Sequence, residues 1–279
     1  MIPYTSLIKN QADPAVLFSI CTIVNNHEEY LLMKESFETC GFNENCEYII
    51  ADNTENNQFH AYDAISRFIK ESKGKYLIVV HQDVRCIDHK NDLLNCLDKL
   101  TRSDDKWALC GNAGGMGHHQ NVLHINSDGK IIKHTNLPAR VHSLDENLLI
   151  IKKDTNLTIS SDLNGFHLYG VDLCIIADFL GYSSYVIPFM VKHLSLGNVK
   201  ELKKQVPGFV TAYGKKLRSR YIQTTCTNFY LSSSVFNNKL YNFPPVYFFV
   251  KAYQRLKFGI KIITGRYPHK KTISYETNT

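Results

Sequence analysis

Apolar, β-rich segments alternate with segments of helical periodicity through the first half of the chain, and this alternation limits the possible folds most strongly. The apolar segments lie at 16–24, 47–53, 75–83 and 107–115. Between them, apolar residues recur three or four positions apart, which is the pattern of an amphipathic helix. Strand and helix in regular succession predict an α/β fold whose mostly parallel sheet is covered by helices on both faces.

The predicted helices cover 27–40, 59–74 and 92–100. In the first of them, Met33 and Phe37 share one face, and Gly41 suits a helix C-cap. The second half is less regular. It predicts a hairpin at 122–134, a strand at 148–154, a helix at 171–181, a strand at 184–193 and a helix at 244–263.

The bulk composition is that of an ordinary globular protein. The chain has 279 residues, of which 44% are hydrophobic and 21% charged, and this excludes a disordered or disulfide-dense scaffold. Its eight cysteines form no CxxC pair and read as reduced thiols of the core. No apolar run reaches 18 residues and the N-terminus has no signal-peptide pattern, so we expect a cytoplasmic protein.

Charge is distributed unevenly along the chain. Residues 1–199 carry 17 Lys and Arg against 24 Asp and Glu, whereas residues 200–279 carry 15 against 2. The change predicts a main domain at 1–199 and a basic extension at 200–279. Within the extension, the aromatic and basic helix at 244–263 suits an anionic membrane surface, or else packs on the main domain. No pattern of a nucleic-acid-binding module accompanies it.

Polar side chains follow the predicted strands where the strands end, which is where ligands bind in open parallel sheets. The clearest is Asp83, because it directly follows the apolar run YLIVV. An oxygen ligand held by a rigid strand suits a hard divalent cation, although a lone Asp at this position is more often a turn residue. The complete set is Asn25, Asp52, His81, Gln82, Asp83 and Asn112.

From about residue 16 to 198, this order of elements resembles glycosyltransferase family 2 on a GT-A (Rossmann-like) fold. The HQDV segment around Asp83 is similar to that of the streptomycin-biosynthesis-type branch. The resemblance implies that Asp83 is the last Asp of a DxD-type motif and holds Mn²⁺ or Mg²⁺ against the diphosphate of a sugar donor. His81 stands where the motif has its first Asp. The donor half would cover about 16–115 and the acceptor half about 116–199.

The resemblance also assigns roles to residues outside the HQDV segment. Asp172, just before a helix, would be the catalytic base, and His193 would complete the metal site; a plain helix-start Asp and an ordinary His are the alternatives. Asp52 would meet the base or ribose, or else is a turn residue. The nucleotide-sugar contacts would be Ile23, Val24, Asn25, Asp52, Gln82 and Asp83, and the further sugar contacts His81, Asn112, Asp145 and Glu146.

Together these features predict a metal-dependent inverting glycosyltransferase. It would move a sugar from a nucleoside-diphosphate donor to a hydroxyl of a glycan or lipid-linked acceptor, in surface polysaccharide biosynthesis at the inner face of the cell membrane. Two alternatives stay open: a sugar nucleotidyltransferase and a non-catalytic carbohydrate-binding protein on the same fold. The Gly-rich segment 111–119 matches neither a P-loop nor a dinucleotide fingerprint, and we expect it to be a flexible loop at the site.

Overall fold

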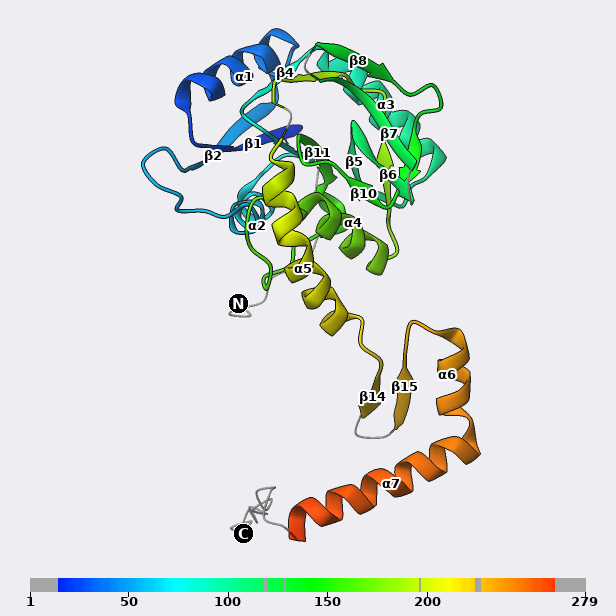
Figure 1. Cartoon of the computed structure of the whole chain (residues 1–279). Helices are drawn as coiled ribbons and strands as arrows, with labels where there is room; N and C mark the ends of the chain where they lie inside the picture. Colours follow the sequence, from blue (N-terminus) through cyan, green and yellow to red (C-terminus); the bar gives the residue numbers. More distant parts are fainter. Residues whose placement is uncertain (1–14, 118–119, 128, 196, 224–226, 264–279) are drawn as a thin grey trace, which may run out of the picture. The chain divides into compact units, whose positions relative to one another are not determined.

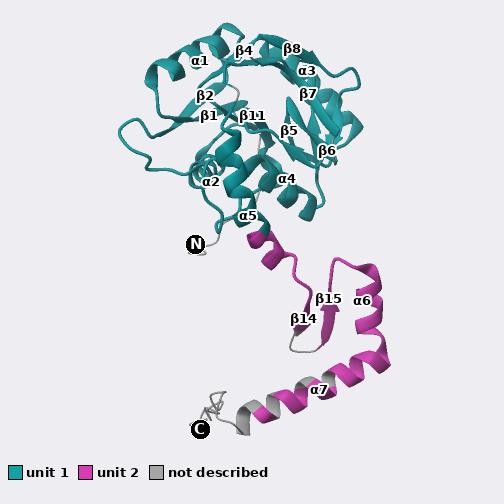
Figure 2. Ribbon diagram, viewed as in Figure 1, with its two compact units in different colours: residues 1–210 teal, residues 211–279 magenta. Residues whose placement is uncertain are grey.

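The computed structural model describes residues 15–117, 120–127, 129–195, 197–223 and 227–263. The chain divides into two compact units, residues 1–210 and 211–279 (Figure 2). The seven cysteines in the described part of the chain are free thiols, as predicted, and Cys226 lies outside that part.

A seven-stranded sheet forms the centre of the first unit (Figure 1). Five of its strands run parallel to one another, and β11 and β9 run against them. The predicted mostly parallel sheet is therefore confirmed. In spatial order the strands are β2 (Cys46–Asp52), β1 (Phe18–Val24), β3 (Tyr76–Val80), β11 (Leu148–Lys152), β5 (Trp107–Gly111), β12 (Ser183–Val186) and β9 (Ala139–Val141).

Helices cover both faces of this sheet, because successive strand residues point to opposite sides. One hydrophobic cluster joins the sheet to α1 (His27–Thr39) and α3 (Lys90–Ser103). The opposite cluster joins it to α2 (Ala61–Glu71) and α4 (Tyr169–Phe179). A short 3₁₀ helix, Lys153–Thr155, follows β11. The predicted α/β class with two covered faces is confirmed.

A second sheet lies beside the first and was not predicted. Its order is β10 (Ser143–Leu144), β6 (Ala113–Gly117), β7 (Gln120–Ser127), β13 (Val191–His193) and β4 (Val84–Cys86), with β8 (Lys130–Lys133) paired to β7. The predicted hairpin is confirmed as β7 and β8, although Asp128 of its turn lies outside the described residues. The predicted single strand at 184–193 is wrong, because the chain leaves the first sheet after β12 and enters the second as β13.

The glycine-rich segment 111–119 is also not the expected flexible loop, since β6 occupies most of it. A Cβ atom on Gly114 would lie 2.3 Å from the carbonyl oxygen of Ser143, so only glycine permits the pairing of β6 with β10. A similar approach occurs where a Cβ on Gly170 would lie 2.3 Å from the carbonyl oxygen of Leu144. These two glycines let β6 and α4 come close to β10.

After β13 the chain continues into α5 (Val199–Lys216), which begins in the first unit and ends in the second. The second unit adds the strand pair β14 (Arg220–Gln223) and β15 (Asn228–Leu231), then α6 (Val235–Asn242) and α7 (Pro244–Ile263). Only α7 was predicted, and its bounds agree with the prediction. None of the helices in the described residues is both long and apolar enough to cross a bilayer.

Candidate metal centre and adjoining cavities

Asp83 lies in the short connection between β3 of the first sheet and β4 of the second. The connection turns tightly, with the Val84 amide donating to the carbonyl oxygen of His81 over 3.2 Å. Strand β4 pairs antiparallel with β13, and this register sets Val84 opposite His193. The change of sheet after β3 therefore brings His81 and Asp83 next to His193, which lies 110 positions after Asp83 along the chain.

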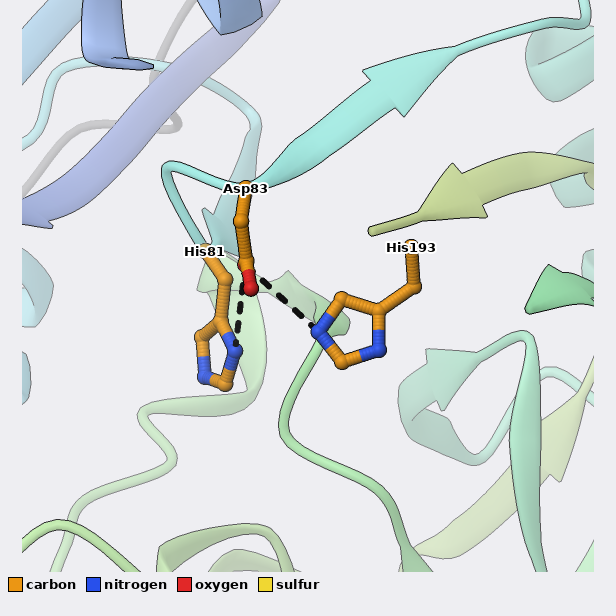
Figure 3. Close-up of side chains that lie close together, drawn as sticks. All are labelled: His81, Asp83 and His193. Atoms are coloured by element: carbon orange, nitrogen blue, oxygen red, sulfur yellow. Dashed lines mark ion pairs between the residues drawn. The ribbon is translucent and has the colours of Figure 1, made fainter. Parts of the chain in front are cut away.

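The three side chains converge on one point (Figure 3). The Asp83 Oδ1 atom lies 3.5 Å from His193 Nε2 and 3.9 Å from His81 Nδ1. One ligand atom from each residue lies within 4.8 Å of the other two, which is close enough for one cation to contact all three. Within the described residues, this is the one group of three or more His, Cys, Asp or Glu side chains with that geometry.

The electrostatic setting favours an ionised Asp83 beside a neutral His81. Burial raises the pKa of Asp83, but hydrogen bonds from His193 and Ser195 outweigh it and hold the pKa well below its ordinary value. Burial lowers the pKa of His81, although 39% of its side-chain surface still faces open space. His81 lies deep in a concave part of the surface, so the surrounding protein disfavours its charged form.

These residues fit a divalent transition metal. Two imidazole nitrogens and one carboxylate oxygen are a donor set that Mn²⁺, Fe²⁺, Co²⁺ and Zn²⁺ accept readily, whereas Mg²⁺ prefers an all-oxygen set. The ionised Asp83 supplies charge neutralisation, and the neutral His81 has a lone pair to offer.

One cavity of about 480 Å³ opens on the β1 and β2 side of this cluster. It brings together four of the predicted nucleotide-sugar contacts, namely Ile23, Asn25, Gln82 and Asp83. Gln82 Oε1 accepts from the backbone amides of Asn25 and Asn26, at 3.0 and 3.1 Å, so the Gln82 side chain ties the end of β1 to the Asp83 turn.

Two predicted donor contacts do not reach this cavity. Val24 is fully buried in the core. Asp52 is exposed, and its Oδ1 accepts from the amide and hydroxyl of Thr54, as a turn residue does. Its neighbour Asn53 lines the cavity instead, held by two hydrogen bonds to the backbone of Phe59.

A second cavity of about 360 Å³ adjoins the cluster on the side of the second sheet. Asp145 and Glu146 line it, as the sequence led us to expect of sugar contacts. The opposite wall is aliphatic, with Leu123, Ile125 and Ile132. The two cavities share His81, His167, His193, Ser195, Gly197 and Asn198. No lysine or arginine is among the described residues that line either of them.

The two neighbouring acids have different settings. Asp145 faces the cavity, and burial, followed by the negative charge of Glu146, raises the pKa of Asp145. Glu146 Oε2 lies 3.9 Å from His167 Nδ1, and both side chains are mostly buried. Asp145 therefore faces the cavity with a raised carboxyl pKa, whereas the Glu146 carboxylate lies beside His167.

Two other predicted site residues lie outside both cavities. Asp172 is fully buried in the first turn of α4, where its carboxylate accepts from the Ser160 amide at 2.8 Å and from the Ser160 hydroxyl at 2.6 Å. Asn112 is also fully buried, and neither of its amide atoms has a hydrogen-bond partner among the described residues. Neither residue is among those that line the two cavities beside the cluster.

Several residues of the site were not predicted, among them Asn53, Asn147, His167 and Tyr169. His167 and Tyr169 belong to the irregular stretch FHLYG before α4, and Asn147 directly follows the predicted acid pair. The adjacency of Asn147 to that pair was a usable signal. For His167 and Tyr169 no periodicity or spacing indicated an orientation toward the site.

Comparisons with known proteins show one clear relative. No protein-family model matches the chain. The "ATP synthase subunits region ORF 6" protein of Fuscovulum blasticum is 35% identical over 202 residues, which cover 69% of this chain and 81% of that protein. The chain belongs to the same family as this protein. The relative's name refers to a gene region and states no activity.

Two solved structures share a distant similarity of shape. The A197 protein from STIV has a TM-score of 0.42 and 11% identity, over 64% of this chain and 86% of that one. A mutant Drosophila β-1,4-galactosyltransferase 7, in complex with manganese, UDP-Gal and xylobiose, has a TM-score of 0.39 and 9% identity, over 68% of this chain and 74% of that one. At these TM-scores neither similarity decides what this chain does.

Proposed function

We propose that this protein is a metal-dependent glycosyltransferase that uses a nucleoside-diphosphate sugar. The observation that carries the proposal is the position of the His81, Asp83 and His193 cluster, at the junction of two cavities and at the end of a central strand. One cavity holds the donor and the other the acceptor, and the shared cluster lies where the sugar is transferred.

The charge of the cavities supports a role for a cation. A nucleoside diphosphate is strongly anionic, yet the described lining residues of both cavities include no lysine or arginine. His81, Asp83 and His193 would hold a divalent cation, which would supply the positive charge that a leaving diphosphate needs. Asn25 and Gln82 would orient the nucleotide half of the donor in the larger cavity.

We assign the catalytic base to Asp145 in place of the predicted Asp172. A general base must reach the acceptor hydroxyl, and Asp145 faces the second cavity whereas Asp172 lines neither. Burial also raises the carboxyl pKa of Asp145, which makes it a better proton acceptor than an ordinary aspartate. A single displacement, with Asp145 taking the hydroxyl proton and the diphosphate leaving from the opposite face, inverts the anomeric centre.

The test is a panel of nucleoside-diphosphate sugars, each measured with and without Mn²⁺. We expect one donor to raise the melting temperature in the presence of the cation, because a bound ligand stabilises the folded state. The same donor should release nucleoside diphosphate when an acceptor is added. Pyrophosphate release from a nucleoside triphosphate would instead identify a nucleotidyltransferase, and donor binding without release across an acceptor panel would identify a sugar-binding protein.

The second unit supports placement of the acceptor at a membrane. On α7, Phe249, Tyr253, Leu256 and Ile260 follow one another at helical spacing, and each is more than half exposed. From 211 to 263 the sequence contains no Asp or Glu. Arg255 and Lys257 are exposed on the same helix, whereas the side chains of Lys251, Phe258, Lys261 and Ile262 lie outside the described set.

Exposed aromatic and aliphatic side chains together with positive charge are typical of a helix that lies on an anionic bilayer. We therefore propose a peripheral protein of the inner membrane face whose acceptor is a lipid-linked glycan of surface polysaccharide biosynthesis. Co-sedimentation with phosphatidylcholine vesicles, with and without phosphatidylglycerol, tests this. The double variant Phe249→Ser, Leu256→Ser should lose the binding that phosphatidylglycerol confers, and Leu180→Ser, an exposed residue of the first unit, should keep it. Equal binding by both variants would contradict the proposal.

A further inference from the structure

A buried tyrosine contacts the back of the metal centre. Tyr169, in the first turn of α4, is 2% exposed, and its hydroxyl oxygen lies 2.7 Å from His81 Nε2. The same hydroxyl donates to the backbone carbonyl oxygen of Glu146 over 3.3 Å. On the opposite side of the His81 ring, Nδ1 faces Asp83 at 3.9 Å. The His81 ring therefore lies between a tyrosine and the cation site.

The hydrogen-bond roles around Tyr169 determine which nitrogen of His81 carries the proton. A carbonyl oxygen only accepts, so the Tyr169 proton points to Glu146. The Tyr169 oxygen is then an acceptor for His81, and Nε2 must be protonated to donate to it. A neutral imidazole has one N–H, so His81 Nδ1 is left with a lone pair directed toward Asp83.

The reverse arrangement is less favourable. If Tyr169 donated to Nε2, the Glu146 carbonyl would lose this donor, and the proton on Nδ1 would point at Asp83 from a distance too long for a hydrogen bond. A cation beside Asp83 would also repel that proton. Burial raises the pKa of Tyr169 well above its ordinary value, so the tyrosine stays a neutral phenol throughout.

We propose that Tyr169 is a positioning residue that fixes His81 as a metal ligand through Nδ1, and that the site thereby selects cations that accept imidazole over Mg²⁺. This inference rests on the proposed metal centre and concerns its specificity. Two imidazoles and one carboxylate suit Mn²⁺, Fe²⁺, Co²⁺ and Zn²⁺, whereas Mg²⁺ favours oxygen ligands and retains its water.

Equilibrium cation binding to the full chain, without donor or acceptor, tests the inference. Free Mn²⁺ is followed by electron paramagnetic resonance, Co²⁺ by its absorption spectrum, and Mg²⁺ by competition with Mn²⁺. We expect Mn²⁺ to bind more tightly than Mg²⁺, and Tyr169→Phe to weaken Mn²⁺ binding about tenfold, as loss of an outer-shell partner does. Tyr48→Phe is the matched control, because Tyr48 is a partly buried tyrosine of β2 whose hydroxyl donates to the backbone carbonyl of Phe42 over 3.0 Å and which lines neither cavity.

A double-variant cycle separates positioning from a general effect on packing. His81→Asp restores a carboxylate at residue 81 and should shift the preference toward Mg²⁺. In the His81→Asp background, Tyr169→Phe should cause no further loss of affinity, because no imidazole is left to orient. An equal loss in both backgrounds, or no loss in either, would overturn the inference.

The failure of this inference differs from the failure of the proposed function. If the wild-type chain binds Mn²⁺ and Asp83→Asn abolishes the binding, the proposed metal centre is supported, whatever the effect of Tyr169→Phe. If the wild-type chain binds no cation, the metal centre and the inference are both wrong. Should Tyr169→Phe fail to fold, as judged by thermal unfolding, the ring ¹⁵N chemical shifts of His81 in the wild-type chain decide the matter: a proton on Nε2 supports the inference, and a proton on Nδ1 overturns it.

Discussion

Asp83 and Asp172 were both predicted to act in the reaction, yet the structure places them in opposite settings. Asp83 lines the larger cavity, with two histidines 3.5 and 3.9 Å from its Oδ1. Asp172 is fully buried, and Ser160 donates to each of its carboxylate oxygens. One carboxylate has room for a ligand, and the other already has partners within the fold.

The difference shows how the role of an acidic residue depends on whether its hydrogen-bonding capacity is already used. A buried carboxylate that its neighbours satisfy stabilises the fold, and removing it leaves donors without partners. A carboxylate that faces open space beside neutral imidazole nitrogens can bind a cation. The following predictions test this contrast.

The largest effect is expected at Asp83. Asp83→Asn removes the charged ligand, so transfer activity should fall by about 10³-fold or more. The melting temperature should fall only modestly, because the side chain is partly exposed and the contacts it loses are the hydrogen bonds from His193 and Ser195. Nucleoside diphosphate release and thermal unfolding measure the two quantities. If Asp83→Asn kept wild-type turnover with a chelator present, Asp83 would have no role in the reaction.

Asp172 should show the reverse pattern. Asp172→Ala leaves the Ser160 donors unpaired inside the protein, so we expect the free energy of unfolding to fall by about 3 kcal/mol. Ser160→Ala, the matched change on the partner, should cost about 1 kcal/mol. Denaturant unfolding gives both values. If Asp172→Asn kept its stability but lost turnover, Asp172 would regain the role of base.

The pH dependence of turnover tests Asp145. A base acts when ionised, so kcat/KM should fall as the pH falls through the pKa of Asp145, which burial and Glu146 raise above the ordinary value of 3.8. Glu146→Gln removes a neighbouring negative charge, lowers that pKa and should move the acid limb to lower pH. A limb that does not move in Glu146→Gln, or one that persists in Asp145→Asn, would assign the limb to another group.

The smallest effect is expected at Asp52, which is exposed and accepts a hydrogen bond from the Thr54 amide in the same turn. Asp52→Asn should leave both stability and the affinity for a nucleoside diphosphate unchanged, whereas Asn53→Ala should weaken that affinity because Asn53 lines the larger cavity. Isothermal titration of the two variants measures the difference. A loss confined to Asp52→Asn would restore the predicted role of Asp52 in donor binding.

Much of the first sheet could be predicted because its signals are local. Buried strands such as β3 are continuous apolar runs, and α2 has one clear apolar face. The position of Asp83 at the end of β3 followed from the same signal. Polar side chains at several strand ends could be expected to meet, because parallel strands end at one edge of a sheet.

The second sheet and the full site could not be predicted, because they depend on contacts between distant segments. Strands β4 and β13 have three residues each, too few for a periodic signal, and they form only by pairing with each other and with β7. That pairing brings His193 to Asp83. The burial of Asp172 depends on Ser160, twelve positions earlier in a segment without regular structure.

The close approach of Gly170 to Leu144 has a consequence for the evolution of this family. Tyr169 precedes that glycine and Asp145 follows that leucine, so a single van der Waals contact sets the spacing between the residue behind the metal and the proposed base. Any side chain at residue 170 would push α4 away from β10, and so would move Tyr169 away from Asp145. Among relatives that retain activity, we expect residue 170 to vary less than the charged residues around it, whose chemistry other side chains can replace.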